Sequence, residues 1–249
     1  MIILKLPAEI EKMRASNAIV AEILNALKEK VTPGITTGEL DSYSEELVRK
    51  KGAQPAFKGY MGYPYSLCIS VNSEVVHGFP SDRVLVEGDI VSLDFGAYYQ
   101  GYYGDAAITV PVGKISEKAA RLIRVTEDGL YKGIREARAG NRLGDISAAI
   151  QNCVEAAGFS VVRDFVGHGI GKKLHEEPQI PNYGTKGRGI QLKAGMVFAI
   201  EPMVNEGTYK VKVVDNGWTV VTEDGKLSAH FEHSVAITED GPDILSMVN

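Results

Sequence analysis

The chain has 249 residues, of which 44% are hydrophobic, and it carries a formal net charge of −5. This length and composition can bury a large core in one domain covering residues 1–249, and no linker or low-complexity tract divides the sequence. No apolar run is long enough to cross a membrane, and 27 basic residues mixed with 32 acidic ones do not form the concentrated basic face that nucleic-acid binding requires. Two cysteines and the absence of a secretion signal favour the reducing cytoplasm.

The first half is expected to fold as two helices followed by strands. An apolar stripe with a proline in its first turn predicts a helix over about 7–30. The capping box Thr36-Thr-Gly-Glu39 opens a second helix, which Gly52 ends. Strands are expected over 66–76 and from 89 through 110.

The second half is expected to repeat that order, with helices over about 116–138 and 142–157 before a strand around His168 and a second acidic hairpin. Asp94 and Glu201 each end a segment that reads Leu-x-x-Gly-x-[Ile/Val]-[Val/Phe]-x-[Leu/Ile]-acid. The glycines that match in order are Gly34 with Gly140, Gly38 with Gly144, and Gly52 with Gly158. We therefore expect an internal repeat, roughly 7–110 and 116–240, with a pseudo-twofold axis and one helix-covered sheet of the α/β (α+β) class.

Asp94 stands in the apolar run Asp89-Ile-Val-Ser-Leu-Asp94-Phe, where an ionised carboxylate costs on the order of several kcal/mol without a compensating charge. Asp105 follows across a Gly- and Tyr-rich stretch that suits a hairpin bending at Tyr99-Gln100. In that register the two aspartates face each other, which destabilises a sheet unless cations bridge them. The alternative, that Asp94 faces solvent and Asp105 closes a turn, stays open at this point.

Three further residues complete a candidate metal site. Asn216-Gly217 is a strong hairpin turn, and a hairpin centred on it places Glu201 opposite Glu232. His168 lies among glycines that leave its imidazole open, although a lone histidine is more often a satisfied structural residue. Four carboxylates and one neutral imidazole would balance two divalent ions, and such ligation suits Mn, Fe, Co or Zn.

The segment that runs from Phe165-Val-Gly-His168-Gly-Ile-Gly to Leu174-His175-Glu-Glu-Pro resembles the signature of the type I methionine aminopeptidases. The stretches 70–80, 94–105, 199–203 and 228–234 follow that family's order and spacing. The resemblance implies the pita-bread fold and a two-metal centre. The ligands that it implies are Asp94, Asp105, His168, Glu201 and Glu232. The chain departs from the family at His230, usually Gln, at Ser234, usually Thr, and at Tyr103, where His is common.

The resemblance also implies the activity, which is removal of the N-terminal methionine from peptides and nascent chains with a small second residue. A water shared by two metal ions can supply hydroxide near neutral pH, and we expect Glu201 to shuttle its proton. His175 would donate to the oxyanion, and His77 would hold the scissile amide or the leaving residue. The residues implied to line the methionine pocket are Phe57, Tyr60, Tyr63, Cys68, Leu174 and Trp218. Cys68 is interpreted as pocket wall because no basic partner marks it as an activated thiolate.

Two other functions compete with this one. A proline-directed dipeptidase or Xaa-Pro aminopeptidase could use the same five ligands, but such proteins carry an additional N-terminal domain for which 249 residues leave no room. A binding module that kept the fold and lost the chemistry would be expected to lack ligands. For His77, His175 and the pocket aromatics, an ordinary structural role stays open. The chain is expected to act as a monomer, and the sequence leaves open the metal, docking on ribosomes and the role of His230.

Overall fold

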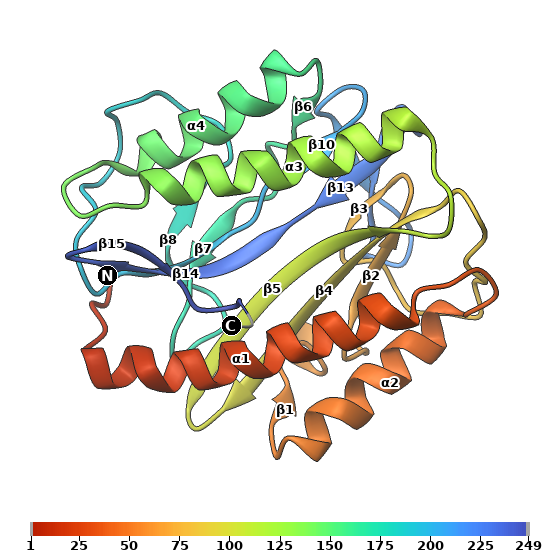
Figure 1. Ribbon diagram of the computed structural model, residues 1–249, viewed down its shortest axis with the longest axis horizontal. Coiled ribbons are helices and arrows are strands. Elements are labelled where there is room, and N and C mark those ends of the chain that lie inside the picture. Colours follow the sequence, from red (N-terminus) through yellow and green to blue (C-terminus); the bar gives the residue numbers. More distant parts are fainter. Residues whose placement is uncertain (1, 248–249) are drawn as a thin grey trace.

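A computed structural model describes residues 2–247, which fold around one curved antiparallel sheet of nine strands (Figure 1). The strands follow the order β1-β4-β5-β14-β9-β7-β8, with β2 paired to β4 and β15 paired to β14. Their bounds are β1 Gln54–Pro55, β2 Cys68–Val71, β4 Ile90–Tyr99, β5 Tyr102–Pro111, β7 Gly167–Gly169, β8 Glu176–Ile180, β9 Val197–Ile200, β14 Glu232–Thr238 and β15 Gly241–Ile244.

Two three-stranded sheets stand beside the main one. Their orders are β13-β10-β6 and β11-β12-β3. The bounds are β3 Glu74–Val76, β6 Ser160–Val161, β10 Met203–Asn205, β11 Val211–Val213, β12 Val220–Thr222 and β13 Ser228–His230. The second of these sheets joins the two halves of the chain, because β12 pairs with β3.

The four expected helices are confirmed as α1 Pro7–Lys30, α2 Thr37–Lys50, α3 Glu117–Glu136 and α4 Leu143–Ala156, and a short 3-10 helix, η1, covers Tyr60–Gly62. The expected capping box also forms, because the Thr36 hydroxyl accepts from the Glu39 N–H at 3.1 Å while the Glu39 carboxylate accepts from the Thr36 N–H at 2.8 Å. Among residues 2–247, no helix is long and apolar enough to span a membrane.

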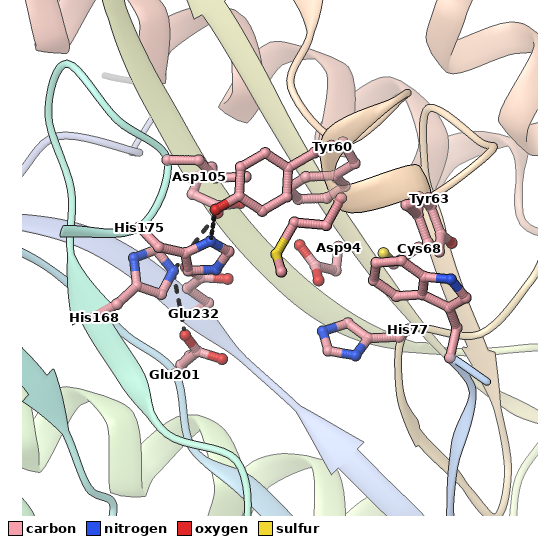
Figure 2. A pocket seen from close by; sticks show the side chains of 14 residues that line it. Tyr60, Tyr63, Cys68, His77, Asp94, Asp105, His168, His175, Glu201 and Glu232 are labelled. Atoms are coloured by element: carbon pink, nitrogen blue, oxygen red, sulfur yellow. Dashed lines mark hydrogen bonds and ion pairs between the residues drawn. The ribbon is translucent and has the colours of Figure 1, made fainter. Parts of the chain in front are cut away.

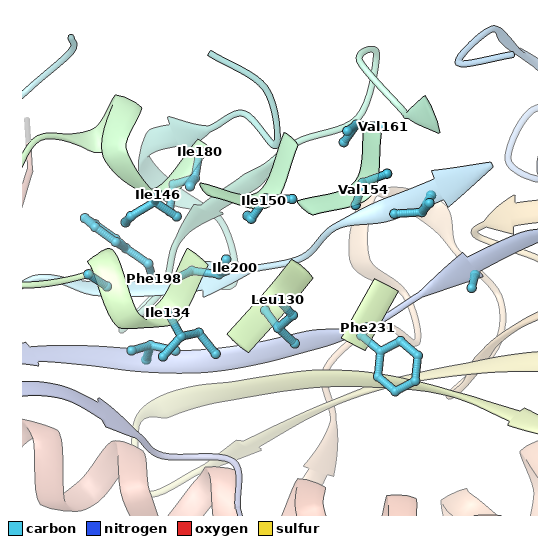
Figure 3. Close-up of a cluster of buried hydrophobic side chains, with 14 of the residues drawn as sticks. Leu130, Ile134, Ile146, Ile150, Val154, Val161, Ile180, Phe198, Ile200 and Phe231 are labelled. Atoms are coloured by element: carbon cyan, nitrogen blue, oxygen red, sulfur yellow. The ribbon is translucent and has the colours of Figure 1, made fainter. Parts of the chain in front are cut away.

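The helices cover one face of the sheet and leave the other to the acidic residues. Leu93 and Phe95 of β4 pack in the cluster under α1 and α2, so the alternation of a strand turns Asp94 to the opposite face. Figure 3 shows the corresponding cluster under α3 and α4, where Phe198 and Ile200 of β9 meet apolar side chains of both helices. The helix-covered face therefore holds the core, and the other face is available for the site.

The register of the first hairpin differs from the prediction by two residues. Tyr99 pairs with Tyr102, so the turn is Gln100-Gly101 rather than Tyr99-Gln100. Both turn residues have positive φ, +50° and +88°, as the two-residue turns that match strand twist require, and glycine supplies the second at no steric cost. Asp94 and Asp105 are therefore diagonal neighbours, not a facing pair. A shift of two residues preserves the face, and both still line one pocket (Figure 2).

The register of the second hairpin is confirmed along its whole length. Pairs centred on Asn216-Gly217 recur in β11 with β12, in β10 with β13 and in β9 with β14. The last of these ladders reaches Ile200 opposite His233. Glu201 and Glu232 therefore lie together at its end.

The glycines that match between the two halves share backbone conformations. Gly34 and Gly140 have φ of +99° and +94°, and Gly52 and Gly158 have φ of +70° and +79°. Each pair occupies the same place relative to a helix, before α2 or α4 and after it. These matches support the expected internal repeat.

The third matched pair yields a test of the fold. Gly38 and Gly144 are the second residues of α2 and α4, and each N–H donates to a loop carbonyl, at 2.8 and 2.9 Å. A Cβ at Gly144 would overlap the Thr185 carbonyl oxygen and lie 2.9 Å from that of Arg188, whereas one at Gly38 would lie 3.1 Å from the Ser81 oxygen. We expect Gly144→Ala to lower the free energy of unfolding by about 1–3 kcal/mol, and Gly38→Ala to lower it by less. Urea denaturation of the two variants checks this, and equal losses would contradict it.

Candidate metal centre

The structure places every predicted site residue around one pocket of about 180 Å³ (Figure 2). The residues that line it are Phe57, Tyr60, Met61, Tyr63, Cys68, His77, Asp94, Asp105, His168, Leu174, His175, Glu201, Trp218 and Glu232. Only Met61 was not expected there from the sequence. The roles assigned to these residues stay predictions, but their convergence is a property of the fold.

Five neighbouring strands deliver the five expected metal ligands. In the sheet order β4, β5, β14, β9 and β7, they carry Asp94, Asp105, Glu232, Glu201 and His168, with Glu201 immediately after the last residue of β9. Side chains on one face of adjacent strands, about 4.8 Å apart, can share an ion, and the curvature of the sheet turns the outer strands toward the same pocket. The sheet therefore gathers residues that are distant along the chain.

The distances within the cluster suit ligation. One ligand atom from each of Asp105, His168 and Glu232 lies within 4.8 Å of the others. The His168 Nε2 is 3.5 Å from a carboxylate oxygen of Glu201 and 4.0 Å from one of Asp105. Oxygen atoms with one imidazole nitrogen form a donor set that suits divalent transition metals.

Burial and mutual repulsion raise the pKa of all four carboxyl groups. Burial raises the pKa of Asp94 to about 8. Burial and then the charges of neighbouring carboxylates raise those of Asp105, Glu201 and Glu232 well above their usual range. Burial, with a smaller contribution from His175, lowers the pKa of His168 to about 3, so its imidazole is neutral at pH 7. The pocket thus favours forms with little charge unless cations enter it.

Three carboxylate oxygens have no partner of their own. The Oδ1 atoms of Asp94 and Asp105 and the Oε1 atom of Glu232 are buried, and no group among residues 2–247 donates a hydrogen bond to them. Buried acceptors without donors are destabilising, whereas bound cations would satisfy them. The donor set therefore fits divalent metal ions.

The main chain of Asp105 is held from two sides. Its N–H lies 3.3 Å from both the Asn17 side-chain oxygen on α1 and the Ser234 hydroxyl on β14. The Ser234 hydroxyl also donates to the Asp105 carbonyl at 2.9 Å. Ser234 is one of the departures from the family pattern, and these contacts place it directly behind a candidate ligand.

The two predicted substrate-contacting histidines stand on different segments. The His175 Nδ1 lies 2.8 Å from the Tyr60 hydroxyl, and its ring centroid is 4.2 Å from that of His168. His77 has a φ of +57°, and its carbonyl accepts from the Thr219 hydroxyl at 3.2 Å. Burial, and then the neighbouring His175, lowers the pKa of His77 to about 4, so it is neutral at pH 7.

An apolar wall closes the pocket beside Asp94. The rings of Tyr63 and Trp218 meet edge to face with centroids 5.2 Å apart. The long second hairpin supplies Trp218, because it extends across to the first half of the chain, where β12 pairs with β3. Burial, with the charge of Asp94 second, raises the pKa of the Cys68 thiol well above its usual range. The Cys68 thiol is therefore neutral at pH 7, and its role as a wall residue stays a prediction.

His230 is the polar group that the sequence alone could not place. It is buried, and its Nε2 lies 3.9 Å from a carboxylate oxygen of Glu201 without a hydrogen-bond partner among the described residues. The sequence signal that could have placed His230 near the site is its position two residues before Glu232. Asn182 was missed as well, and its amide donates to the Glu201 carbonyl at 3.0 Å. No sequence pattern predicts that Met61 lines the pocket. It is 81% exposed and has a φ of +48°.

A curved antiparallel sheet whose open face gathers acids and one imidazole beside an apolar wall is the arrangement of a pita-bread metallopeptidase. The chain belongs to metallopeptidase family M24, whose model matches residues 11–239. Membership implies the use of divalent metal ions, in agreement with the cluster of Asp105, His168 and Glu232.

Within family M24 the chain groups with the methionine aminopeptidases. It is 60% identical over 248 residues to the methionine aminopeptidase of Clostridium perfringens, covering 100% of both chains. It is 56% identical to methionine aminopeptidase 1 of Bacillus subtilis, again over 100% of both. A crystal structure of the methionine aminopeptidase from Thermotoga maritima superposes with a TM-score of 0.98 at 52% identity, with full coverage of both chains.

The competing proline-directed enzymes share the fold but are less similar. The prolidase from Pyrococcus furiosus matches with a TM-score of 0.80 and 25% identity, covering 99% of this chain and 66% of that one. The chain thus resembles one part of a longer proline-directed enzyme.

The raised carboxyl pKa values predict how stability depends on pH and metal. A carboxyl group with a folded-state pKa of about 8, against an ordinary value of 3.8, contributes stability at low pH that is lost as the pH rises through 8. We expect the melting temperature of metal-free protein to fall between pH 5 and pH 8. Mn²⁺ at 100 times its Kd should stabilise the protein by about 2.7 kcal/mol. Calorimetry at both pH values measures these effects.

The control for that experiment is Asp94→Asn, which removes one buried charge without changing the size of the side chain. Its metal-free form should lose less stability between pH 5 and pH 8, and Mn²⁺ should stabilise it less. An equal response of the variant and the parent protein would contradict this assignment of Asp94.

Proposed function

We propose that this chain removes the N-terminal methionine from peptides and nascent proteins in the cytoplasm, with a preference for a small second residue. The observation that carries the proposal is that one pocket joins a cluster of metal-ligand side chains to an apolar wall. Relatives that are 60% and 56% identical over their full length are methionine aminopeptidases. A single metallopeptidase domain, built from two repeated halves, accounts for the matched glycines and helices.

We further propose that the site takes two divalent ions, Mn, Fe, Co or Zn, held by Asp94, Asp105, His168, Glu201 and Glu232. Four carboxylates balance the charge of two such ions. The three buried carboxylate oxygens that accept no hydrogen bond would be free to coordinate them. When bound, the ions would acidify a shared water and polarise the scissile carbonyl group.

The apolar wall would select the methionine side chain. Tyr63 and Trp218 present ring surfaces, and Cys68 adds a neutral sulfur at the base of β2. A thioether makes favourable contacts with aromatic rings and polarizable atoms. The same pocket of about 180 Å³ is also lined by the candidate metal ligands, so the methionine side chain and the scissile bond would lie in one cavity.

Three residues would carry the proton transfers and hold the peptide. Glu201 lies between the imidazoles of His168 and His230, and its carboxylate would accept a proton from a bound water and pass it to the leaving amine. His175 would donate a hydrogen bond to the oxygen of the scissile carbonyl group. His77, neutral at pH 7, would bind the scissile amide or the second residue.

The substrate test compares peptides that differ only near the cleaved bond. Metal-free protein is reconstituted separately with Mn²⁺, Fe²⁺, Co²⁺ or Zn²⁺ and assayed for release of the first residue. We expect Met-Ala-Ser to be cleaved at least about 10²-fold more efficiently than Met-Leu-Ser, because a close pocket rejects the larger second side chain. Cleavage confined to peptides with proline in second position would favour the prolidase function instead.

Replacing Glu201 by Gln tests the proton shuttle. The amide keeps the shape of the side chain but cannot accept the proton, so kcat should fall by about 10²-fold or more. The variant should fold at least as well as the parent at pH 8, because one buried charge is removed. A kcat within about threefold of the parent would remove Glu201 from this role.

A further inference from the structure

Lys5 is a buried lysine outside the metal cluster. Its side chain is 4% exposed, and its Nζ donates to a carboxylate oxygen of Glu176 at 2.7 Å. The Glu176 side chain is 7% exposed. No other Lys or Arg ion pair within residues 2–247 has both side chains below a tenth exposed. Because lysine is rarely buried without reason, this pair invites a functional explanation.

Glu176 lies at the base of the loop that carries His175. We call residues 171–175 the His175 loop; it follows β7 and ends where Glu176 begins β8. The second carboxylate oxygen of Glu176 accepts from the Lys173 N–H at 3.2 Å, so this side chain is hydrogen-bonded to the main chain of the loop. A Cβ at Gly171 would lie 2.6 Å from Glu176 and 2.7 Å from the Lys5 side chain, which shows how closely the pair packs against the loop.

The main chain of Lys5 is itself fixed beside β9, the strand that pairs with β7. Its N–H donates to the Gly195 carbonyl at 2.7 Å, at the entrance to β9. Figure 1 shows the segment before α1 beside the edge of the sheet where β7 and β8 lie. The ion pair therefore connects a main chain that is held in place to a loop that carries a catalytic candidate.

We propose that Lys5 is a positioning residue for His175. Its ion pair with Glu176 fixes the His175 loop so that the imidazole stays against Tyr60 and His168, at the distances of 2.8 Å and 4.2 Å given above. This rests on the proposed function, in which His175 donates to the scissile carbonyl group. A displacement of about 1 Å in such a group can lower the rate by about 10²-fold.

The kinetic test uses Lys5→Met, which keeps the unbranched apolar stem of the side chain and removes the terminal charge. We expect kcat for Met-Ala-Ser to fall by about 10- to 100-fold, with KM and the Mn²⁺ affinity within about threefold of the parent. Lys5→Arg should recover part of the loss. In a His175→Ala background, Lys5→Met should have little further effect, because the group that it positions is already absent.

A matched control is available in the same N-terminal region of the chain. Arg14 of α1 pairs with Asp243 of β15 at 2.6 Å, and this ion pair also ties the N-terminal region to a distant strand. Arg14→Met should leave kcat within about twofold of the parent. An equal loss in both variants would show that any loosening of this region matters, and it would overturn the specific role of Lys5.

A readout that needs no turnover separates this proposal from the proposed function. The chain has five histidines, so the imidazole nitrogens of ¹⁵N-histidine-labelled protein can be resolved by NMR and assigned by replacement. Lys5→Met should shift the signals of His175 and leave those of His233, which lies against Ser246, unchanged. If the parent protein fails to release methionine, the proposed function falls, while these spectra still decide the positioning role.

Three results would overturn the role of Lys5. They are a parent-like kcat with parent-like His175 signals, a loss of kcat with unchanged His175 signals, and a further equal loss in the His175→Ala background. If Lys5→Met does not fold, Glu176→Gln removes the partner's charge at nearly constant volume, and the same measurements apply.

Discussion

Four carboxylates share one pocket, and none of the residues that line it is a lysine or an arginine. Their burial and their mutual repulsion oppose folding, as their raised pKa values show. The remaining structure has to hold them in place against this repulsion until cations neutralise it. Metal binding is thus linked to folding, because bound ions offset the burial and mutual repulsion of the carboxylates, which otherwise lower the stability of the folded protein.

The fold provides that restraint through the division of the sheet into two faces. Apolar side chains of β4 and β9 point into clusters under the helices, and the alternate positions point to the site. A one-residue slip of any of these strands would move an acid into the core, so the core packing also fixes the register of the ligands. The second hairpin then crosses to the first half and supplies Trp218 to the apolar wall, which joins the metal cluster to the pocket.

Much of this could be predicted from local patterns. Capping residues and apolar stripes predicted the helices, the Asn216-Gly217 turn predicted a register that holds over three ladders, and acids in apolar strands indicated the candidate ligands. The register at Gln100-Gly101 was missed because a non-glycine residue adopts positive φ there. The contacts of His230 with Glu201 and of Lys5 with Glu176 join residues far apart in the chain, and only the assembled fold brings them together.

The most direct test of the metal centre is a crystal structure of the protein grown with Mn²⁺ and recorded near the manganese absorption edge. The convergence of Asp94, Asp105, His168, Glu201 and Glu232 predicts two anomalous peaks between these side chains, each within ligand distance of the carboxylate oxygens. Manganese bound elsewhere, with these five side chains left without an ion, would contradict it.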